Sequence, residues 1–326
     1  MTKELKARAG GAELPGGTDA GRTAAAAPTG IIERVAFRLP VAPPAMRFPT
    51  DLIHLLERSL SAPRPRVRAL HLPPPSAMGS KAGEFCALEL DDGSLGLSYV
   101  LLDDSLARLL DGDAAGAVVG MDALALARRF VKGGAAERTL GFAAANALSR
   151  TVLDRAGYRP PRGGDSIGGI DPRPGEHVGM IGLFSPLLRR VLEAGARLTV
   201  VELEPAWTGD FDGYRVTLDA RELERCDKVL STSTVLLNDS LDRMLAHCRR
   251  ARYVALIGPS AGCLPDPLFA RGVSAVGGSW IDDGPGLVDA LRRGEPWGAF
   301  AWKFLIRRED YPGRAAPDAS ALSAGR

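Results

Sequence analysis

The chain of 326 residues has few cysteines, few aromatic residues and little net charge. Its four cysteines, Cys86, Cys226, Cys248 and Cys263, form no CxxC pair, which argues against a zinc ribbon and against a disulfide framework. Lysine and arginine number 41 against 39 acidic residues, and this balance is not typical of proteins that bind nucleic acid or anionic membranes. From these observations we expect an ordinary globular protein.

Long apolar runs are also missing. No stretch approaches the ~20 apolar residues of a membrane helix. The first residues, MTKELKARAGGAELPGG, lack the apolar segment of a secretory signal. We therefore expect a cytoplasmic protein without membrane or nucleic-acid partners, and the composition leaves its oligomeric state open.

Glycine and proline, in contrast, are abundant, with 38 and 24 residues, and their positions suggest boundaries. Residues 1–45 are rich in Ala, Gly, Pro and Thr and are predicted to be a disordered extension. A second cluster at residues 161–172 predicts a linker. The polar residues 312–326 are predicted to be a disordered tail.

Residues 46–160 are predicted to form a smaller α+β domain. Leucines at helical spacing follow Pro49, and two apolar runs surround Asp92-Gly93, a strong hairpin signal. Stretches of helical pattern then end close to glycines, as helices often do. The order of one helix, then strands, then helices is typical of an α+β domain.

Residues 173–311 alternate between short apolar strands and helical segments. Such alternation predicts a Rossmann-like domain, in which helices cover both faces of a mostly parallel sheet. Ligands of open parallel sheets bind beyond the carboxyl ends of the strands, so the candidate residues are those that end the strands.

The first two strand ends combine small and acidic residues. Gly182, Phe184 and Ser185 connect a strand to a helix whose free N–H groups favour an anion, although a plain tight turn fits equally well. Glu202 ends the next strand, at the spacing of a ribose-binding acid in dinucleotide folds. A metal ligand and a solvated acid are equally good interpretations of Glu202.

The next strand ends carry hydroxyls and small residues. Ser and Thr side chains there suit phosphate or carboxylate binding, and they also cap helices well. Glycines allow a backbone to approach a ligand closely. Cys263 fits a thiolate ligand or nucleophile less well than a bystander small residue. The candidates in these segments are Thr232, Ser233, Thr234, Asn238, Gly258, Pro259, Ser260, Cys263, Gly277 and Gly278.

These segments together resemble one bacterial and archaeal family, described as a heavy-metal chelation domain. The matching stretches are IGLFSP, VVELEP, STSTVLLNDSLDRML, ALIGPS and LFARGVSAVGG, with DDGSLGLSYVLL and GFAAANALS in the first domain. The resemblance implies a Rossmann-like domain over about 173–309, a companion domain with an enolase N-terminal-like fold, and a cleft between them. This chain departs from the family where Ala261-Gly262-Cys263 replaces the usual Thr-Pro.

Three functions remain open at this point. The family resemblance favours binding of a transition metal or a metal complex, with Glu202, Glu204, Cys263, Asp282 and Asp283 near the predicted strand ends. Hydroxyls and backbone N–H groups suit a chelated metal better than a bare ion. The alternatives are an enzyme or binding protein for a small anionic or nucleotide-like molecule, and a non-catalytic accessory protein.

Overall fold

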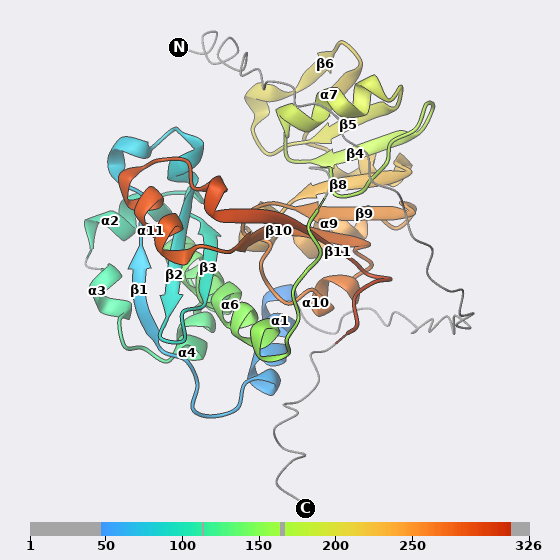
Figure 1. Cartoon of the computed structure of the whole chain (residues 1–326). Coiled ribbons are helices and arrows are strands. Elements are labelled where there is room, and N and C mark those ends of the chain that lie inside the picture. Colours follow the sequence, from blue (N-terminus) through green and yellow to red (C-terminus); the bar gives the residue numbers. More distant parts are fainter. Residues whose placement is uncertain (1–46, 113, 164–166, 314–326) are drawn as a thin grey trace, which may run out of the picture. The chain divides into compact units, whose positions relative to one another are not determined.

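An antiparallel sheet and its helices form the first part of the chain. The structure is a computed structural model that describes residues 47–112, 114–163 and 167–313 (Figure 1). The three-stranded sheet has the order β1-β2-β3. Its strands are β1 (Val67–His71), β2 (Phe85–Leu90) and β3 (Leu95–Tyr99). The expected hairpin joins β2 to β3, and Gly93 supplies the positive φ, +85°, that its turn requires.

The helices of this part surround a long central helix, α6 (Ala135–Arg155). The others are α1 (Phe48–Ser59), α2 (Ser105–Asp111), α3 (Ala114–Val118), α4 (Ala123–Ala127) and α5 (Arg129–Lys132), with the short 3-10 turns η2 (Pro75–Ala77) and η3 (Lys81–Glu84). Because one side of α6 carries small alanine side chains, the helix backbone lies directly against the backbone of β3. An added Cβ on Gly96 of β3 would overlap the carbonyl oxygen of Ala143 and the amide nitrogen of Ala147.

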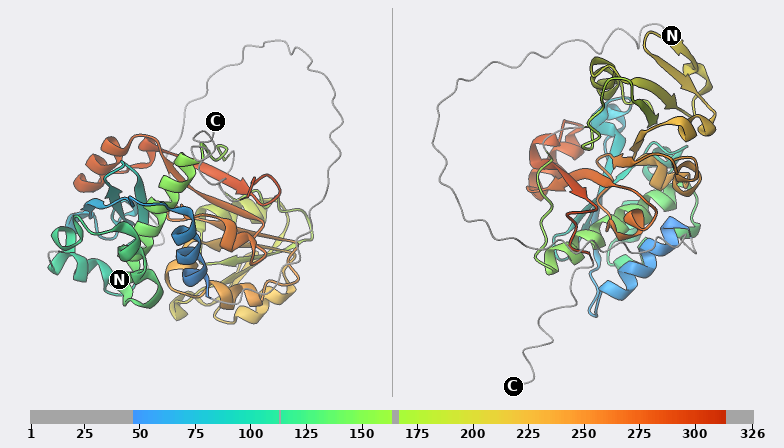
Figure 2. Two further views of the ribbon diagram at one scale, coloured as in Figure 1. Left: turned by 90° about the horizontal axis from the view of Figure 1, so that it is seen from below. Right: turned by 90° about the vertical axis from the view of Figure 1, so that its right-hand side faces the viewer.

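Both faces of the small sheet are buried, because α6 covers one face and a helix from the second part of the chain covers the other. Cys86 and Leu88 pack in the core that includes α6. Phe85 and Leu97 instead pack against α11 (Gly284–Arg293), which lies beside the small sheet in Figures 1 and 2. The apolar sequences FCALEL and LGLSY therefore lack the alternation of a strand with one wet face.

The second part of the chain is built on an eight-stranded sheet of the order β11-β10-β9-β8-β4-β5-β7-β6. Its central strands are parallel, and the edge strands β6 and β11 run antiparallel to their neighbours. The strands are β4 (His177–Ile181), β5 (Arg197–Val201), β6 (Gly209–Phe211), β7 (Tyr214–Thr217), β8 (Lys228–Thr232), β9 (Tyr253–Ile257), β10 (Ala275–Ile281) and β11 (Ala301–Arg307). The sequence pattern did not indicate β6, β7 or β11, since β6 is short and exposed and β11 mixes tryptophan, lysine and arginine.

Short helices connect these strands. They are α7 (Ser185–Glu193), α8 (Thr234–Leu237), α9 (Leu241–Ala246) and α10 (Asp266–Phe269), together with the 3-10 turns η4 (Pro205–Trp207), η5 (Ala220–Arg225) and η6 (Gly298–Phe300). The predicted fold class, a mostly parallel Rossmann-like sheet preceded by a smaller α+β part, is confirmed.

Contacts run between the two parts at several points. The guanidinium of Arg271, after α10, lies 2.6 Å from Asp51 of α1 and 2.6 Å from Asp242 of α9. Ile167 and Ile170, in the predicted linker, are buried in the core of the large sheet. All described residues belong to one compact unit, Val41–Arg326. The boundary at residues 161–172 stays a prediction, and the predicted extension at 1–45 and most of the tail lie outside the described residues.

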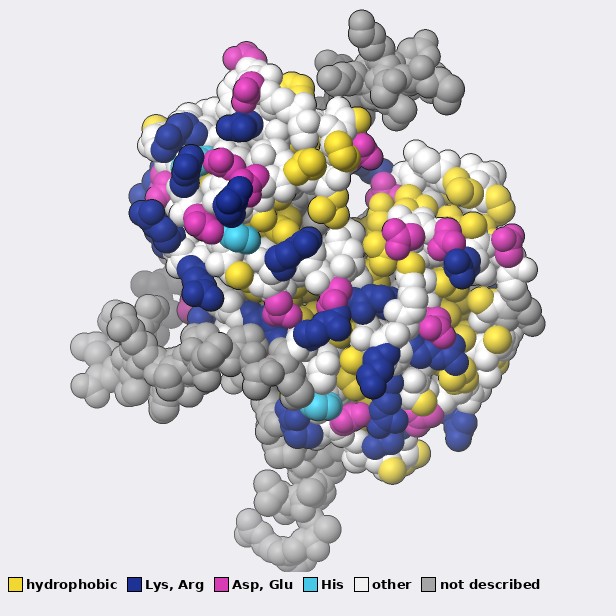
Figure 3. All heavy atoms as spheres, turned by 180° about the vertical axis from the view of Figure 1, so that it is seen from behind, with side chains coloured by type: hydrophobic (Ala, Val, Ile, Leu, Met, Phe, Trp, Pro, Cys, Tyr) yellow, Lys and Arg dark blue, Asp and Glu magenta, His cyan; other side chains and the backbone are white. Residues whose placement is uncertain are grey.

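Two surface properties bear on partners. Within the described ranges, no helix is both long enough and apolar enough to cross a membrane. Basic and acidic side chains are interspersed on the face seen in Figure 3, without a field of one sign there. This mixture agrees with the nearly balanced composition.

Candidate functional site

The carboxyl ends of β5, β4, β8, β9 and β10 follow one another along one edge of the large sheet. Twelve of the fourteen candidate residues lie at or beyond these ends, and the other two, Gly277 and Gly278, lie within β10. Phe184 is the N-cap of α7, and Ser185 is the first residue of that helix. The structure gives these residues three different surroundings along the edge.

At the ends of β4 and β5, an acidic side chain holds a turn. Glu202 accepts hydrogen bonds from the backbone N–H of Leu183 at 2.8 Å and of Leu203 at 2.7 Å, one at each carboxylate oxygen. Gly182 has a φ of +83°, and a Cβ there would lie 2.9 Å from the methyl carbon of Thr232. Glu202 and Gly182 thus shape the β4–α7 turn, and the carboxylate is already engaged.

The hydroxyl-rich segment after β8 bonds mostly to itself. Thr232 Oγ1 lies 3.1 Å from the hydroxyl of Thr234 and accepts its backbone N–H at 3.2 Å. Asn238 Oδ1 accepts the hydroxyl of Ser240 at 2.6 Å and its N–H at 3.1 Å, so Asn238 shapes the turn between α8 and α9. These are local turn contacts rather than helix caps, because neither α8 nor α9 has a side-chain cap at its N-terminus.

The segment after β9 is buried against the first part of the chain. The Ser233 and Ser260 hydroxyls lie 3.1 Å apart, and a Cβ on Gly258 would overlap Ser233 Oγ. Asn146 of α6 donates through Nδ2 to the carbonyl oxygens of Ser260 at 2.9 Å and of Leu97 at 2.7 Å. The Gly258–Cys263 loop therefore connects the end of β9 to α6 and β3.

Gly277 and Gly278 lie in the same region and serve close packing. A Cβ on Gly278 would lie 2.6 Å from the ring of Phe304, on the neighbouring strand β11. A Cβ on Gly277 would lie 3.2 Å from Ile257 of β9. The two glycines let Phe304 lie over β10 beside the Gly258–Cys263 loop.

A cavity of about 30 Å³ lies where this loop meets the small sheet and α6, and we call it the interface cavity. It is lined by Leu95, Gly96, Leu97, Asn146, Arg150, Leu153, Pro160, Pro259, Gly262, Cys263, Ser279, Trp280, Ile281, Phe304 and Ile306. Pro259 and Cys263 are candidates from the sequence. Its position, at strand carboxyl ends and between two parts of the fold, is a common one for ligand sites.

Two buried polar atoms of the interface cavity's lining have no hydrogen-bond partner among the described residues. They are the Asn146 carbonyl oxygen Oδ1 and the Trp280 indole nitrogen Nε1. Asn146 is 3% exposed and Trp280 is 4% exposed. A buried polar group without a partner costs roughly 1–3 kcal/mol, so each atom is suited to a water or a ligand.

Among the described residues that line the interface cavity, Arg150 is the one that carries a charge. Its guanidinium carbon lies 3.9 Å from the centre of the Trp280 ring. The guanidinium donates from Nη1 to the Ile281 carbonyl at 2.9 Å and from Nε to Asp154 at 2.7 Å. These contacts hold Arg150 beside the indole.

The sequence analysis missed Asn146, Arg150 and Trp280. A usable signal was present in GFAAANALSR, where Asn and Arg interrupt a helix of alanines. Such polar residues on a helix buried on most sides need specific partners. Trp280 gave no comparable signal, because tryptophan in a strand is ordinary.

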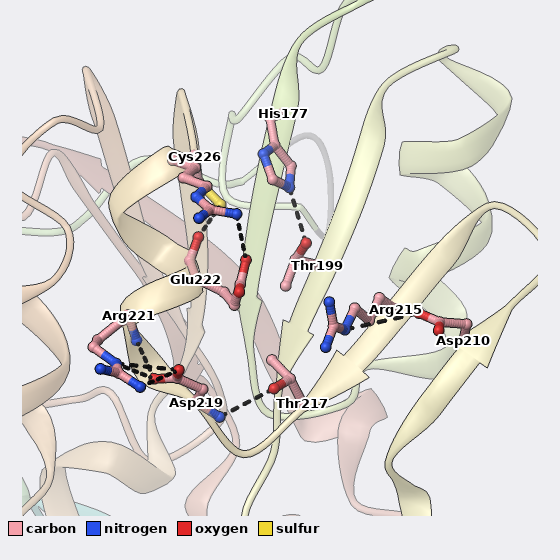
Figure 4. Close-up of polar contacts among 10 residues, drawn as sticks. His177, Thr199, Asp210, Arg215, Thr217, Asp219, Arg221, Glu222 and Cys226 are labelled. Carbon is pink, nitrogen blue, oxygen red and sulfur yellow. Dashed lines mark hydrogen bonds and ion pairs between the residues drawn. The ribbon is translucent and has the colours of Figure 1, made fainter.

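Another polar group, shown in Figure 4, lies toward the opposite end of the strands from the interface cavity. His177 begins β4, and its Nε2 lies 2.9 Å from the hydroxyl of Thr199. Burial lowers the pKa of His177. Cys226 points its thiol to the carbonyl of Glu222 at 3.6 Å.

The side chains of this chain do not fit a bare heavy-metal ion. Within the described ranges, no group of three or more His, Cys, Asp or Glu residues is arranged to hold a metal. All cysteines and histidines of the sequence fall in these ranges. Burial raises the pKa of each cysteine thiol to about 12, whereas metals bind the thiolate.

The carboxylates proposed beside them are also dispersed or engaged. Glu204 accepts the N–H of Ala206 at 3.1 Å, and Asp283 caps α11 by accepting the N–H of Gly286 at 3.0 Å. Asp282 is exposed. We therefore assign no metal ligands among the five residues that the sequence suggested.

Comparisons with known proteins assign two regions of the chain to families with the same description. Residues 167–308 and residues 83–149 match two family descriptions that both read "Putative heavy-metal chelation". An uncharacterized protein of Methanocaldococcus jannaschii is 29% identical over 151 residues, which are 45% of this chain. The aligned region spans 56% of that protein, little more than half of its length.

Two solved structures show the same fold. Both are proteins of unknown function from the family that matches residues 167–308, one from Desulfitobacterium hafniense and one from Pyrococcus horikoshii. Their TM-scores are 0.62 and 0.60 at identities of 19% and 20%. Each comparison covers 80% of this chain and 98% of the other.

Proposed function

Since the chain belongs to the family described as "Putative heavy-metal chelation", as its sequence suggested, we propose that it binds a heavy metal as a complex with an organic ligand. The binding site is the interface cavity, where hydrogen bonds hold the organic part of the complex. The protein then supplies recognition, and the organic ligand supplies the donor atoms around the metal. Like the sequence-based expectation, this proposal places the protein in the cytoplasm.

The unpartnered Asn146 Oδ1 carries this proposal. It offers a buried hydrogen-bond acceptor, which suits an organic molecule that has a donor group. A soft metal ion would instead require thiolate or imidazole ligands, and the described residues provide no group of them. A metal that arrives already chelated reconciles the family description with the chemistry of the side chains.

The test compares bare ions with complexes on the full-length protein. We expect Cd²⁺ and Zn²⁺ alone to leave the thermal midpoint unchanged, and their preformed glycolate or citrate complexes to raise it. A ligand at 100 times its Kd stabilises the native state by about 2.7 kcal/mol. Stoichiometric binding of bare ions, or no response to any complex, would show the proposal to be wrong.

A blocking variant locates the binding. A Cβ on Gly262 would meet only Asn146 atoms, at 3.8 Å, so Gly262→Leu introduces its side chain beside Asn146 without a clash at the Cβ. We expect it to abolish the response to the complexes. Gly298→Leu is the matched control, because nothing lies within 4 Å of a Cβ at that position in η6.

A second candidate function, binding of a small organic anion without metal, is favoured by Arg150. Its carboxylate partner, Asp154 at 2.7 Å, does not line the cavity. The same titrations distinguish the two functions. A metal-free anion that binds as tightly as its metal complex would favour the second function over the first.

A further inference from the structure

We propose that the interface cavity recognises an α-hydroxy or α-amino carboxylate, a carboxylate with a hydrogen-bond donor on the adjacent carbon. This inference rests on the proposed function, because it names the chemical class of the organic ligand at the same site. It is carried by the two unpartnered atoms and by the guanidinium of Arg150 beside them, which also pairs with Asp154 at 2.7 Å.

The acceptor side of the cavity is fixed by Asn146. Both described hydrogen bonds of its Nδ2, to Leu97 and Ser260, are at 2.7 and 2.9 Å, so the amide cannot rotate without losing them. Oδ1 is therefore fixed as the acceptor end of the amide, and it has no donor among the described residues. A ligand hydroxyl or ammonium supplies that donor.

The donor side of the cavity is Trp280 with Arg150. Trp280 Nε1 can only donate, and its buried N–H has no acceptor in the described chain. The guanidinium of Arg150 stacks on the same indole. A carboxylate satisfies the indole N–H and places its negative charge beside the cation, whereas a neutral alcohol gains only the hydrogen bond.

The size of the cavity limits what enters. The cavity is small, because roughly 10–15 Å³ is enough space for one water molecule and the cavity offers about 30 Å³. It therefore takes a very small ligand or only the polar head of a larger one. α-Hydroxy and α-amino carboxylates fit this limit, because their donor and acceptor groups are on neighbouring atoms.

The experiment uses glycolate as the probe, with acetate and glycolamide as controls. Acetate lacks the donor, and glycolamide lacks the negative charge. We expect glycolate to bind at least fivefold more tightly than acetate, which lacks a neutral hydrogen bond of about 1 kcal/mol. It should bind at least tenfold more tightly than glycolamide, because a hydrogen bond to a charged group contributes about 1.5–3 kcal/mol. Equal binding of glycolate and acetate, or of glycolate and glycolamide, would overturn the assignment.

The indole resonance reports the contact directly. We expect glycolate to shift the Nε1–H signal of Trp280 in a ¹⁵N spectrum of the full-length protein. Trp280→Phe should weaken glycolate at least fivefold, as expected for the loss of about 1 kcal/mol from one hydrogen bond. Trp207→Phe is the matched control, because Trp207 is 48% exposed in η4 and does not line the interface cavity.

The outcomes separate the inference from the proposed function. If metal complexes bind but Trp280 does not respond to glycolate, the ligand class is wrong and the function stands. If glycolate shifts Trp280 and added metal changes nothing, the ligand class stands and the function is wrong. If the cavity holds only a bound water, no probe shifts the Trp280 signal, and the ligand class is wrong.

Discussion

At the scale of single residues, burial determines what the four thiols can do. Cys86, Cys226, Cys248 and Cys263 are all buried, and burial raises each pKa to about 12. We predict that dithionitrobenzoate labels none of them in the native protein within minutes at about pH 8, because so few thiolates form. All four should react once denaturant unfolds the chain.

The measurement follows the absorbance of the released thiolate against urea concentration. The labelling should parallel the unfolding seen by circular dichroism. Rapid labelling of Cys263 in the native state would contradict its assignment as a packed side chain. It would then support the thiolate role that the sequence left open.

The sequence predicted the strand ends better than the contacts made there. Strand ends can be found from the alternation of apolar segments, so Ser260 and Cys263 were expected after a strand, and they follow β9. Their contacts were not predictable, because Ser260 meets Asn146 across 114 positions of sequence. The local sequence around a hydroxyl that stabilises a turn does not differ from the sequence around one that binds a ligand.

At the scale of elements, the fit of α6 against β3 depends on Gly96. A side chain there would overlap the backbone of Ala143 and Ala147 on α6. We predict that Gly96→Ala lowers the free energy of unfolding by about 1–3 kcal/mol, the usual cost of overpacking. Urea denaturation measures this change.

Gly298→Ala is the control for that substitution, because a Cβ at Gly298 has no neighbour within 4 Å. It should change the stability by no more than ~0.5 kcal/mol. If Gly96→Ala is as mild as the control, α6 is free to move away from β3. The close approach of helix and strand would then not be required for folding.

Elements with a strong local pattern were predictable, and edge elements were not. The β2–β3 hairpin followed from Asp92-Gly93, and the parallel strands followed from their apolar runs. β6 is only three residues long and exposed, so no alternation marks it. Its pairing with β7 forms through the tertiary arrangement, which a local pattern does not contain.

At the scale of the whole molecule, the small sheet is completed by the C-terminal part of the chain. Phe85, Leu95 and Leu97 share a core with Leu287 and Leu291 of α11. Without α11, this face of the sheet would be exposed to water. Sequence alone assigns these residues to separate segments, so the interlocking of the two parts was not predictable from local patterns.

The contact between His71 of β1 and Arg292 of α11 also joins the first and second parts of the chain, and we expect it to depend on pH. His71 of β1 is 3% exposed, with Nε2 at 3.1 Å from Glu89 and Nδ1 at 3.1 Å from Arg292 of α11. Because Arg292 can only donate, Nδ1 must accept, and the imidazole is neutral. Burial, assisted by the charge of Arg292, lowers the pKa of His71 despite the opposing effect of Glu89.

We predict that this lowered pKa makes the protein less stable in mild acid. The unfolded chain binds the proton with the ordinary pKa of about 6.5, more tightly than the native state does. The contribution of His71 is therefore complete above about pH 6.5 and is lost as the pH falls toward the lowered native pKa. Urea denaturation between about pH 8 and pH 5 should show His71→Gln to be less sensitive to acid than the wild type. An identical pH dependence in both proteins would mean that protonation of His71 does not weaken the contact between β1 and α11.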